Sequence, residues 1–317
     1  MSGKAQKVAI IGCGLIGRGW AIAFARSGWR VALWDSASGA AEASVGAIRV
    51  GLRDLETAGL LAADAASVAQ SVAVVKTMEE AVDGASYVQE NAPERAEVKR
   101  EVFLALDRVT GSTVLIGSST STMPGAVFLA DVPGRRRCIV AHPSNPPHLM
   151  PVVEFVPSPW HDEATVMQLR QLMKSIGQAP IVVKKEIEGF VLNRLQAAVI
   201  NEAISLVAED VIDPPDLDAV MKHGLGLRWA LMGPFETMDL NAPQGFLDYA
   251  QRYARLYESM GRALHPAAPW SISALERIER SRAAQRANES IAMQMERRDR
   301  ALMQLLAMKK SIGADAK

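Results

Sequence analysis

Short apolar runs alternate with longer amphipathic stretches in the first half of the chain. The runs are rich in β-branched residues and end at Gly, Asp or Ser, which is typical of buried strands. They are Val8–Ile11, Val31–Trp34, Val72–Val75, Tyr87–Gln89, Val114–Ile116 and Ile139–Ala141. Helical periodicity covers Ile16–Ser27, Ala40–Leu61 and Glu94–Val109. This alternation predicts an α/β fold with a doubly wound, mostly parallel sheet and helices on both of its faces.

The pattern changes after two further predicted strands, Val152–Val156 and Ile181–Lys184. A charged segment that ends at Gly189 follows, and we place a domain boundary there, between residues 1–187 and 188–317. The second part is helical throughout, beginning with Val191–Glu209. A further helix is expected after Pro214 and Pro215. The sequence therefore predicts an all-α C-terminal domain.

A glycine-rich segment, Gly12-Cys13-Gly14-Leu15-Ile16-Gly17, joins the first strand to the first helix. In a dinucleotide-binding turn the first glycine permits the tight turn, the second lets a pyrophosphate approach, and the third allows close packing. Asp35 ends the second strand about 20 residues later, where a carboxylate binds ribose hydroxyls and repels a 2′-phosphate. This context favours a Rossmann-type NAD site over an ordinary glycine turn. The expected contacts are Gly12, Gly14, Leu15, Ile16, Gly17 and Asp35.

His142 and Glu154 are the candidate catalytic residues. His142 follows the strand Ile139–Ala141, which places it at the carboxyl edge of the sheet, where open α/β folds bind ligands. Glu154 lies in the apolar run Val152–Val156, where a carboxylate is costly without a cationic or hydrogen-bonding partner. A His–Glu pair meets that need and makes the imidazole more basic. From these residues alone, a structural histidine beside an unrelated glutamate explains the pattern equally well.

Several spaced motifs together resemble the 3-hydroxyacyl-CoA dehydrogenase superfamily. They are Gly12–Gly17, Ser118–Ser121, His142–Pro146 with Glu154, and Gly189–Arg194. Within the superfamily the chain is most similar to the lambda-crystallin/L-gulonate 3-dehydrogenase branch, through Cys138–Pro143, Gly189–Gln196 and Gly233–Met238. The likeness extends over nearly the whole chain. It implies an NAD-dependent oxidation of a 3-hydroxyl group and a homodimer formed through the helical domain.

The resemblance also implies roles for individual residues at the reacting centre. His142 matches the catalytic base and Glu154 its partner. Ser121 matches a serine near the substrate oxygen and the nicotinamide, and Asn193 an asparagine that hydrogen-bonds the substrate. The alternatives are a turn or helix-capping role for Ser121 and a helix-start role for Asn193.

Further cofactor contacts are implied in the same way. Glu94 and Lys99 match a pair that contacts the cofactor after the fourth strand, and Asn145 matches another contact. Because Glu94 and Lys99 fall in a predicted helix, a purely solvent-exposed role is the alternative for both.

Arg228 is the residue that bears on the substrate. It lies in the segment Gly224–Glu236, which is longer than the corresponding turn of the acyl-CoA branch. A guanidinium binds a free carboxylate through two hydrogen bonds, whereas a thioester carries no such charge. We therefore expect a small, L-gulonate-like 3-hydroxy acid. The alternatives are an ion pair for Arg228, an acyl-CoA substrate, a carnitine-like substrate beside Trp229, and a non-catalytic crystallin-like role.

Composition narrows the class of protein further. The chain has 317 residues, with 35 Lys and Arg balancing 35 Asp and Glu, which argues against nucleic acid or an anionic membrane as partner. Two cysteines provide no disulfide framework, and no signal peptide is recognised, so a cytoplasmic location is expected. The remaining histidines lack metal-ligand spacing, and no metal is expected. The apolar stripe Ala301, Leu302, Leu305 and Leu306 fits either a dimer interface or the core of the chain itself.

Overall fold

The computed structural model describes residues 5–263, 270–286 and 289–313. The chain forms two compact units. The first is Met1–Asn193 together with Asp299–Ala307, and the second is Arg194–Arg298 with Met308–Lys317. The boundary predicted between residues 187 and 188 stays a prediction.

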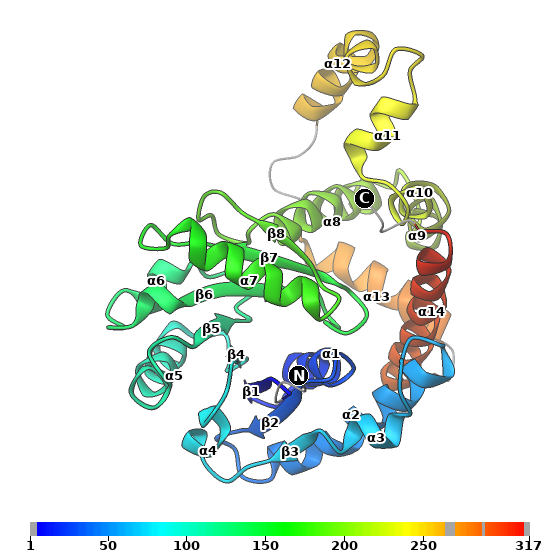
Figure 1. Cartoon of the computed structure of the whole chain (residues 1–317). Coiled ribbons are helices and arrows are strands. Elements are labelled where there is room, and N and C mark those ends of the chain that lie inside the picture. Colours follow the sequence, from blue (N-terminus) through cyan, green and yellow to red (C-terminus); the bar gives the residue numbers. More distant parts are fainter. Residues whose placement is uncertain (1–4, 264–269, 287–288, 314–317) are drawn as a thin grey trace. The chain divides into compact units, whose positions relative to one another are not determined.

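The first unit is built on a sheet whose strands, within the described residues, run in the order β3-β2-β1-β4-β5-β6-β7-β8 (Figure 1). The strands are β1 (Lys7–Ile11), β2 (Arg30–Trp34), β3 (Val72–Val74), β4 (Tyr87–Glu90), β5 (Leu115–Ser118), β6 (Cys138–Pro143), β7 (Val152–Val156) and β8 (Ala179–Val182). Neighbouring strands pair in parallel except β6 and β7, which are antiparallel. The predicted mostly parallel, doubly wound sheet is confirmed.

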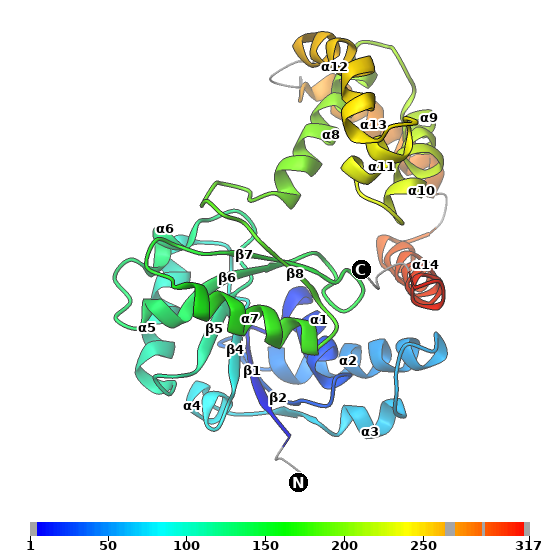
Figure 2. The same ribbon diagram turned by 45° about the horizontal axis from the view of Figure 1, so that its top comes forward.

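Helices cover both faces of this sheet (Figures 1 and 2). One face packs against α1 (Leu15–Ala25), α2 (Ala40–Thr57) and α7 (Glu163–Ser175). The other packs against α4 (Met78–Val82), α5 (Ala96–Val109) and α6 (Gly125–Leu129), and α3 (Ala65–Ala69) follows α2. Side chains alternate between the two cores along β1, where Val8 and Ile10 join the first and Ala9 and Ile11 the second. The strand has no solvent-exposed face, which explains its unbroken apolar sequence.

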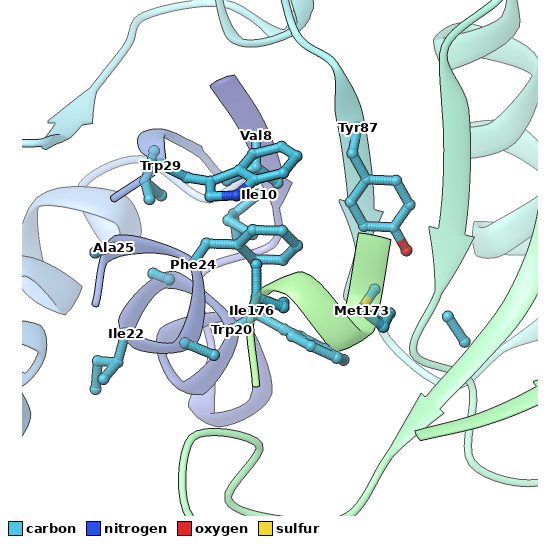
Figure 3. Packing of buried hydrophobic residues seen from close by; sticks show 14 of the residues in the cluster. Val8, Ile10, Trp20, Ile22, Phe24, Ala25, Trp29, Tyr87, Met173 and Ile176 are labelled. Carbon is cyan, nitrogen blue, oxygen red and sulfur yellow. The ribbon is translucent and has the colours of Figure 1, made fainter. Parts of the chain in front are cut away.

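Aromatic side chains fill the first of these cores (Figure 3). Phe24 of α1 lies between Trp29 and Tyr87, with ring centroids 5.1 and 5.8 Å away, and Trp20 follows at 6.0 Å. Met173 of α7 packs in the same cluster, so that α7 and α1 share one core (Figure 3). This packing holds the middle and end of α1 against the sheet, and the glycine-rich turn precedes the same helix.

Some predicted boundaries were wrong. Helix α2 ends at Thr57 rather than Leu61, because Gly59 adopts a left-handed φ of 70° that no helix continues through. Helix α5 begins at Ala96, which leaves Glu94 in the preceding loop. Strand β6 extends to Pro143, so His142 lies inside the strand and not after it.

The second unit is all helical in the part of the chain that the structure describes, as predicted. Its helices are α8 (Leu192–Ala208), α9 (Pro214–Val220), α10 (Gly226–Trp229), α11 (Pro234–Leu240), α12 (Phe246–Ala263) and α13 (Ile272–Arg286). Helix α9 begins at Pro214 itself, because a proline in the first turn loses no helical hydrogen bond.

The last helix, α14 (Ile291–Ser311), contributes to the core of the first unit. Met303 is 3% exposed within that core, and Leu302 and Leu306 pack against it. The stripe predicted as either interface or core therefore belongs, at these positions, to the core. None of the helices described by the structure is long and apolar enough to cross a lipid bilayer.

Candidate active site

His142 and Glu154 face each other across the antiparallel pair β6 and β7. The register aligns the two residues directly, and Nδ1 of His142 lies 2.8 Å from Oε2 of Glu154. The pair is buried, with 5% of His142 and none of Glu154 exposed. A reversal of strand direction thus brings together two residues that come from separate apolar runs.

The second carboxylate oxygen of Glu154 is also fully engaged. Its Oε1 accepts hydrogen bonds from the backbone N–H groups of Val191 at 2.9 Å and Leu192 at 3.0 Å. Burial alone would raise the pKa of Glu154, but hydrogen bonds from His142, Leu192 and Val191 outweigh it and lower the pKa below its ordinary value. Glu154 is therefore ionised at neutral pH.

The segment that leads into α8 directs the N–H groups of Val191 and Leu192 towards the carboxylate of Glu154. Gly189 and Phe190 adopt left-handed φ angles of 72° and 50°, and the strain at Phe190 is held by its full burial. The Phe190 ring centroid lies 5.4 Å from that of His142. The Gly189–Arg194 motif thus orients the carboxylate and covers one side of the imidazole.

Ser121 and Asn193 are in direct contact. The Nδ2 group of Asn193 donates to the carbonyl oxygen of Ser121 at 2.7 Å, and the N–H of Ser121 donates to Oε1 of Glu94 at 2.8 Å. Both contacts use the backbone of Ser121 and leave its hydroxyl for another partner. The turn after β5 is therefore held from two sides.

The glycine-rich turn has the geometry that a dinucleotide requires. Gly12 has a left-handed φ of 89°, and a Cβ at Gly17 would lie 2.0 Å from the carbonyl oxygen of Gly12. A Cβ at Gly14 would instead meet nothing within 4 Å, so the space before the helix is open. Gly14 caps α1 without a side-chain hydrogen bond, which leaves the N–H groups of Leu15 and Ile16 available to a pyrophosphate.

Asp35 follows β2 and holds this turn in place. Its Oδ2 accepts the N–H of Cys13 at 2.7 Å, and its Oδ1 accepts the N–H of Ala37 at 2.9 Å. Each oxygen keeps a second lone pair for a ribose hydroxyl. These residues fit the adenosine half of NAD.

Lys99 and Asn145 differ in their surroundings. Lys99 is only 1% exposed, and its ammonium group contacts Glu90 at 3.0 Å. Asn145 is exposed and precedes Pro146 through a cis peptide bond. The implied cofactor contacts of Glu94, Lys99 and Asn145 stay predictions, but neither Glu94 nor Lys99 has a purely solvent-exposed role.

Sequence reasoning missed the polar residues beneath the site. Ser119 accepts hydrogen bonds from Trp20 at 3.0 Å and Gln89 at 2.8 Å, and its hydroxyl donates to Asn91 at 2.8 Å. The amide of Asn91 in turn donates to the carbonyl oxygens of Ile11 and the neighbouring glycine. The sequence contains one signal of this network, which is the polar end of the otherwise apolar strand β4. This network ties the turn after β5 to the dinucleotide turn.

Arg228 lines a pocket in the helical unit. The pocket has a volume of about 510 Å³, and Trp229, Tyr249 and Tyr257 are among its aromatic lining residues. The hydroxyls of Tyr249 and Tyr257 lie 2.7 Å apart. Within the described ranges Arg228 forms no ion pair.

Among the described residues, the cysteines and histidines outside the pair show no second reaction centre. Cys13 and Cys138 are buried and free, and burial raises the pKa of each thiol to about 12, so neither is a thiolate at neutral pH. No group of three His, Cys, Asp or Glu side chains in the described part of the chain is arranged to hold a metal ion. His265 lies outside the described residues.

Both parts of the chain match models of one protein family. Residues 7–187 match the NAD-binding domain of 3-hydroxyacyl-CoA dehydrogenase, and residues 189–287 match its C-terminal domain. The lambda-crystallin homolog of Mus musculus is 39% identical over 312 residues, 97% of this chain and 98% of that protein. The L-carnitine dehydrogenase of Oceanobacillus iheyensis is 39% identical over 239 residues, 74% of this chain and 76% of that protein.

A solved structure also matches over nearly the full length. It is that of 5-formyl-3-hydroxy-2-methylpyridine 4-carboxylic acid 5-dehydrogenase, described as an NAD⁺-dependent dismutase. Its TM-score is 0.82 at 30% identity, covering 96% of this chain and 99% of that one. The chain therefore belongs to the 3-hydroxyacyl-CoA dehydrogenase family and is an NAD-dependent oxidoreductase that acts on CH–OH groups.

Proposed function

We propose that this chain oxidises the 3-hydroxyl group of a small, L-gulonate-like 3-hydroxy acid to a ketone. The observation that carries the proposal is the buried contact of 2.8 Å between His142 and Glu154. A carboxylate that stays ionised beside an imidazole orients the ring and stabilises its protonated form, as a general base requires.

The proton is taken by Nε2 of His142. Because ionised Glu154 accepts a hydrogen bond from Nδ1, Nδ1 carries the ring proton and Nε2 presents a lone pair. As the C3–H bond breaks, the hydroxyl proton moves to Nε2 and the C3–O bond becomes a carbonyl. The imidazolium that forms lies beside the negative charge of Glu154 and later releases its proton to solvent. NAD, when bound, supplies the acceptor for the hydride that leaves C3.

Ser121 and Asn193 are proposed to position the substrate oxygen. The hydroxyl of Ser121 is not used by the contacts that hold its backbone. The amide of Asn193 lies beside it, and its Oδ1 remains available. Two groups fixed at one turn restrict the oxygen to a geometry from which proton and hydride leave together.

Arg228 supports a free acid as substrate. It has no ion-pair partner among the described residues, and it lies in a pocket with aromatic walls. In such surroundings the ligand group that binds a guanidinium most strongly is a carboxylate, which accepts two hydrogen bonds from it. A relative whose substrate is named as a carboxylic acid, the pyridine carboxylic acid dehydrogenase, is consistent with this class.

The experiment that tests the function is NADH formation with a panel of substrates at matched concentration. The panel contains L-gulonate, L-carnitine, 3-hydroxybutyrate and 3-hydroxybutyryl-CoA. Turnover of one or more free acids, with kcat/KM well above that for the thioester, supports the proposal. Efficient turnover of 3-hydroxybutyryl-CoA alone assigns the acyl-CoA activity, and preference for L-carnitine assigns the carnitine type.

The same panel addresses a non-catalytic, crystallin-like role. A folded chain that binds NADH yet oxidises none of the substrates would favour that role. The presence of His142, Glu154, Ser121 and Asn193 together argues for catalysis.

We further propose a cytoplasmic homodimer that pairs through the helical unit. Phe235, Leu240 and Leu247 are large apolar residues that remain exposed there, and their burial against a second copy would be favourable. Sedimentation at micromolar concentration tests this assembly, and a monomeric mass argues against it.

A further inference from the structure

The N–H groups of the glycine-rich turn are held from the side of β2. The N–H of Gly12 donates to the carbonyl oxygen of Trp34 at 2.9 Å, and the N–H of Cys13 donates to Oδ2 of Asp35 at 2.7 Å. The strands next to β1 in the sheet are β2 and β4. The carbonyl groups that lead into the turn are held from the other side, by a residue that follows β4.

This residue is Asn91, which lies directly after β4. Its Nδ2 donates to the carbonyl oxygens of Ile11 at 3.3 Å, Gly12 at 3.4 Å and Gln89 at 3.1 Å. The two N–H bonds of the amide group are thus shared among three acceptors. Asn91 therefore supports the carbonyl groups of the turn, as Asp35 supports the N–H group of the residue that follows them.

The hydroxyl of Ser119 determines which way the Asn91 amide faces. Its oxygen accepts the indole N–H of Trp20 at 3.0 Å and the side-chain amide of Gln89 at 2.8 Å. Its one proton is donated to Oδ1 of Asn91 at 2.8 Å. Because an indole N–H can only donate and a backbone carbonyl can only accept, the two ends of this network set the direction of every hydrogen bond between them. The amide therefore turns Nδ2, and not Oδ1, towards the carbonyl groups.

Burial makes this direction costly to change. Trp20 and Gln89 have no exposed surface, and Ser119 is 9% exposed. Tyr87, which is also fully buried, donates its hydroxyl to Oε1 of Gln89 at 2.7 Å. A buried polar group that loses its partner raises the free energy of the folded chain. An inverted Asn91 amide would place an acceptor against three other acceptors, so only one arrangement satisfies the network.

We propose that Asn91 is a positioning residue of the cofactor site: its amide group, oriented by Ser119, holds the glycine-rich turn in the shape that binds the pyrophosphate of NAD. The turn precedes the first N–H groups of α1, which are free of a side-chain cap. An anion binds such groups best when their positions are fixed before it arrives. The inference concerns cofactor affinity and holds whichever hydroxy acid the chain oxidises.

Amide hydrogen exchange of the ligand-free chain tests the positioning without any reaction. Asn91→Asp keeps the shape of the side chain but places a carboxylate oxygen against the three carbonyl groups. The N–H groups of Gly12 and Cys13 should then exchange about tenfold faster or more, because the turn loses its support from β4. Asn91→Ala removes the donor without adding charge and should act in the same direction. Wild-type exchange at both N–H groups in the two variants would overturn the proposal.

Two ligands show where the effect on binding arises. ADP-ribose contains the adenosine and pyrophosphate of NADH but lacks the nicotinamide. In Asn91→Ala the Kd values for NADH and for ADP-ribose should rise by the same factor, about tenfold, as expected when a turn that both ligands use loses a hydrogen-bond donor. Unchanged affinity for both ligands would overturn the proposal. A loss confined to NADH would place the effect at the nicotinamide end and would overturn it as well.

Tyr87→Phe is the matched control for a purely structural role. It removes a buried hydroxyl that bonds to Gln89 and to neither turn, so thermal stability should fall while both Kd values stay at the wild-type level. Ser119→Ala then tests the order of action. It should weaken ADP-ribose binding in the wild type but add little in the Asn91→Ala background, because the two residues act through one contact. Equal effects of Ser119→Ala in both backgrounds would overturn the claim that Ser119 acts by orienting Asn91.

Discussion

His142 and Glu154 are paired twice, once through their strands and once through their side chains. The β6–β7 register sets their backbones opposite each other, and Nδ1 and Oε2 then meet at 2.8 Å. In an antiparallel pair such residues project to the same side of the sheet, so no loop has to order before the contact forms. The strand register thus sets the two side chains within hydrogen-bond distance of each other.

The first prediction concerns this pair. His142→Ala should lower kcat by about 10²–10⁴-fold, the usual contribution of a general base, with NADH affinity nearly unchanged. Glu154→Gln keeps the shape but removes the charge that stabilises the imidazolium, so kcat should fall as well. Steady-state kinetics with NADH binding as the control measures both, and wild-type kcat in either variant would contradict the assignment.

The second prediction concerns acid stability and His148. Burial, with the charge of Arg26 nearby, lowers the pKa of His148 from 6.5 to about 4, and its Nδ1 has no hydrogen-bond partner. The unfolded chain takes up the proton near pH 6.5, whereas the folded chain does so only near pH 4. His148 therefore contributes stability that is complete above pH 6.5 and is lost as the pH falls towards 4, by roughly 3 kcal/mol.

Urea unfolding at pH 7.5 and pH 4.5 measures this loss. His148→Gln, which does not titrate, should lose less stability between the two pH values than the wild-type chain. His223→Gln, at an exposed histidine, is the control and should follow the wild type. Equal acid sensitivity in His148→Gln and the wild type would show that other groups determine it.

The third prediction compares two glycines of one turn. In Gly17→Ala the new methyl group would clash with the backbone oxygen of Gly12, so the free energy of unfolding should fall by about 2 kcal/mol or more without any ligand. In Gly14→Ala the methyl group enters open space, so unfolding should change by less than about 0.5 kcal/mol. The same methyl group would occupy the approach of the pyrophosphate, and NADH affinity should fall about tenfold. Urea unfolding and NADH titration of both variants check the contrast.

Local patterns predicted the parts of the site that depend on neighbours along the chain. Apolar runs located β6 and β7, and the cost of a carboxylate inside β7 indicated a partner for Glu154. The surroundings of Lys99 were not predictable in this way. From its position in the helical pattern alone, its side chain could equally be exposed to solvent, and only the tertiary structure shows that it contacts Glu90 at the end of β4. The contact between Asn193 and Ser121 likewise joins segments far apart in sequence. Such contacts depend on tertiary structure, which periodicity does not report.

The fourth prediction concerns the choice of cofactor. The Asp35 carboxylate should repel a 2′-phosphate, so the wild-type chain should prefer NAD to NADP clearly in kcat/KM. Asp35→Ala should weaken this preference. Asp35→Asn keeps an oxygen that accepts the N–H of Cys13 and so separates loss of charge from loss of the turn's support. Equal efficiency with both cofactors in the wild type would refute the assignment.

The last prediction tests the substrate class through Arg228. If its guanidinium binds the carboxylate of the substrate, Arg228→Met should raise KM for a 3-hydroxy acid and lower kcat/KM. A charge-assisted hydrogen bond contributes about 1.5–3 kcal/mol, which corresponds to a loss of about tenfold or more. Arg228→Lys should recover only part of it, because an ammonium group keeps the charge without the planar pair of donors.

Two controls make the result for Arg228 specific. NADH affinity should barely change in either variant, because Arg228 belongs to the helical unit and not to the nucleotide-binding one. Trp229→Phe alters the same pocket without altering its charge, so its effect should not depend on whether the substrate carries a carboxylate. An acyl-CoA enzyme would give the opposite outcome, with turnover of a 3-hydroxyacyl thioester that is indifferent to Arg228. That outcome would reassign the substrate and leave the family and the His142–Glu154 pair as they are.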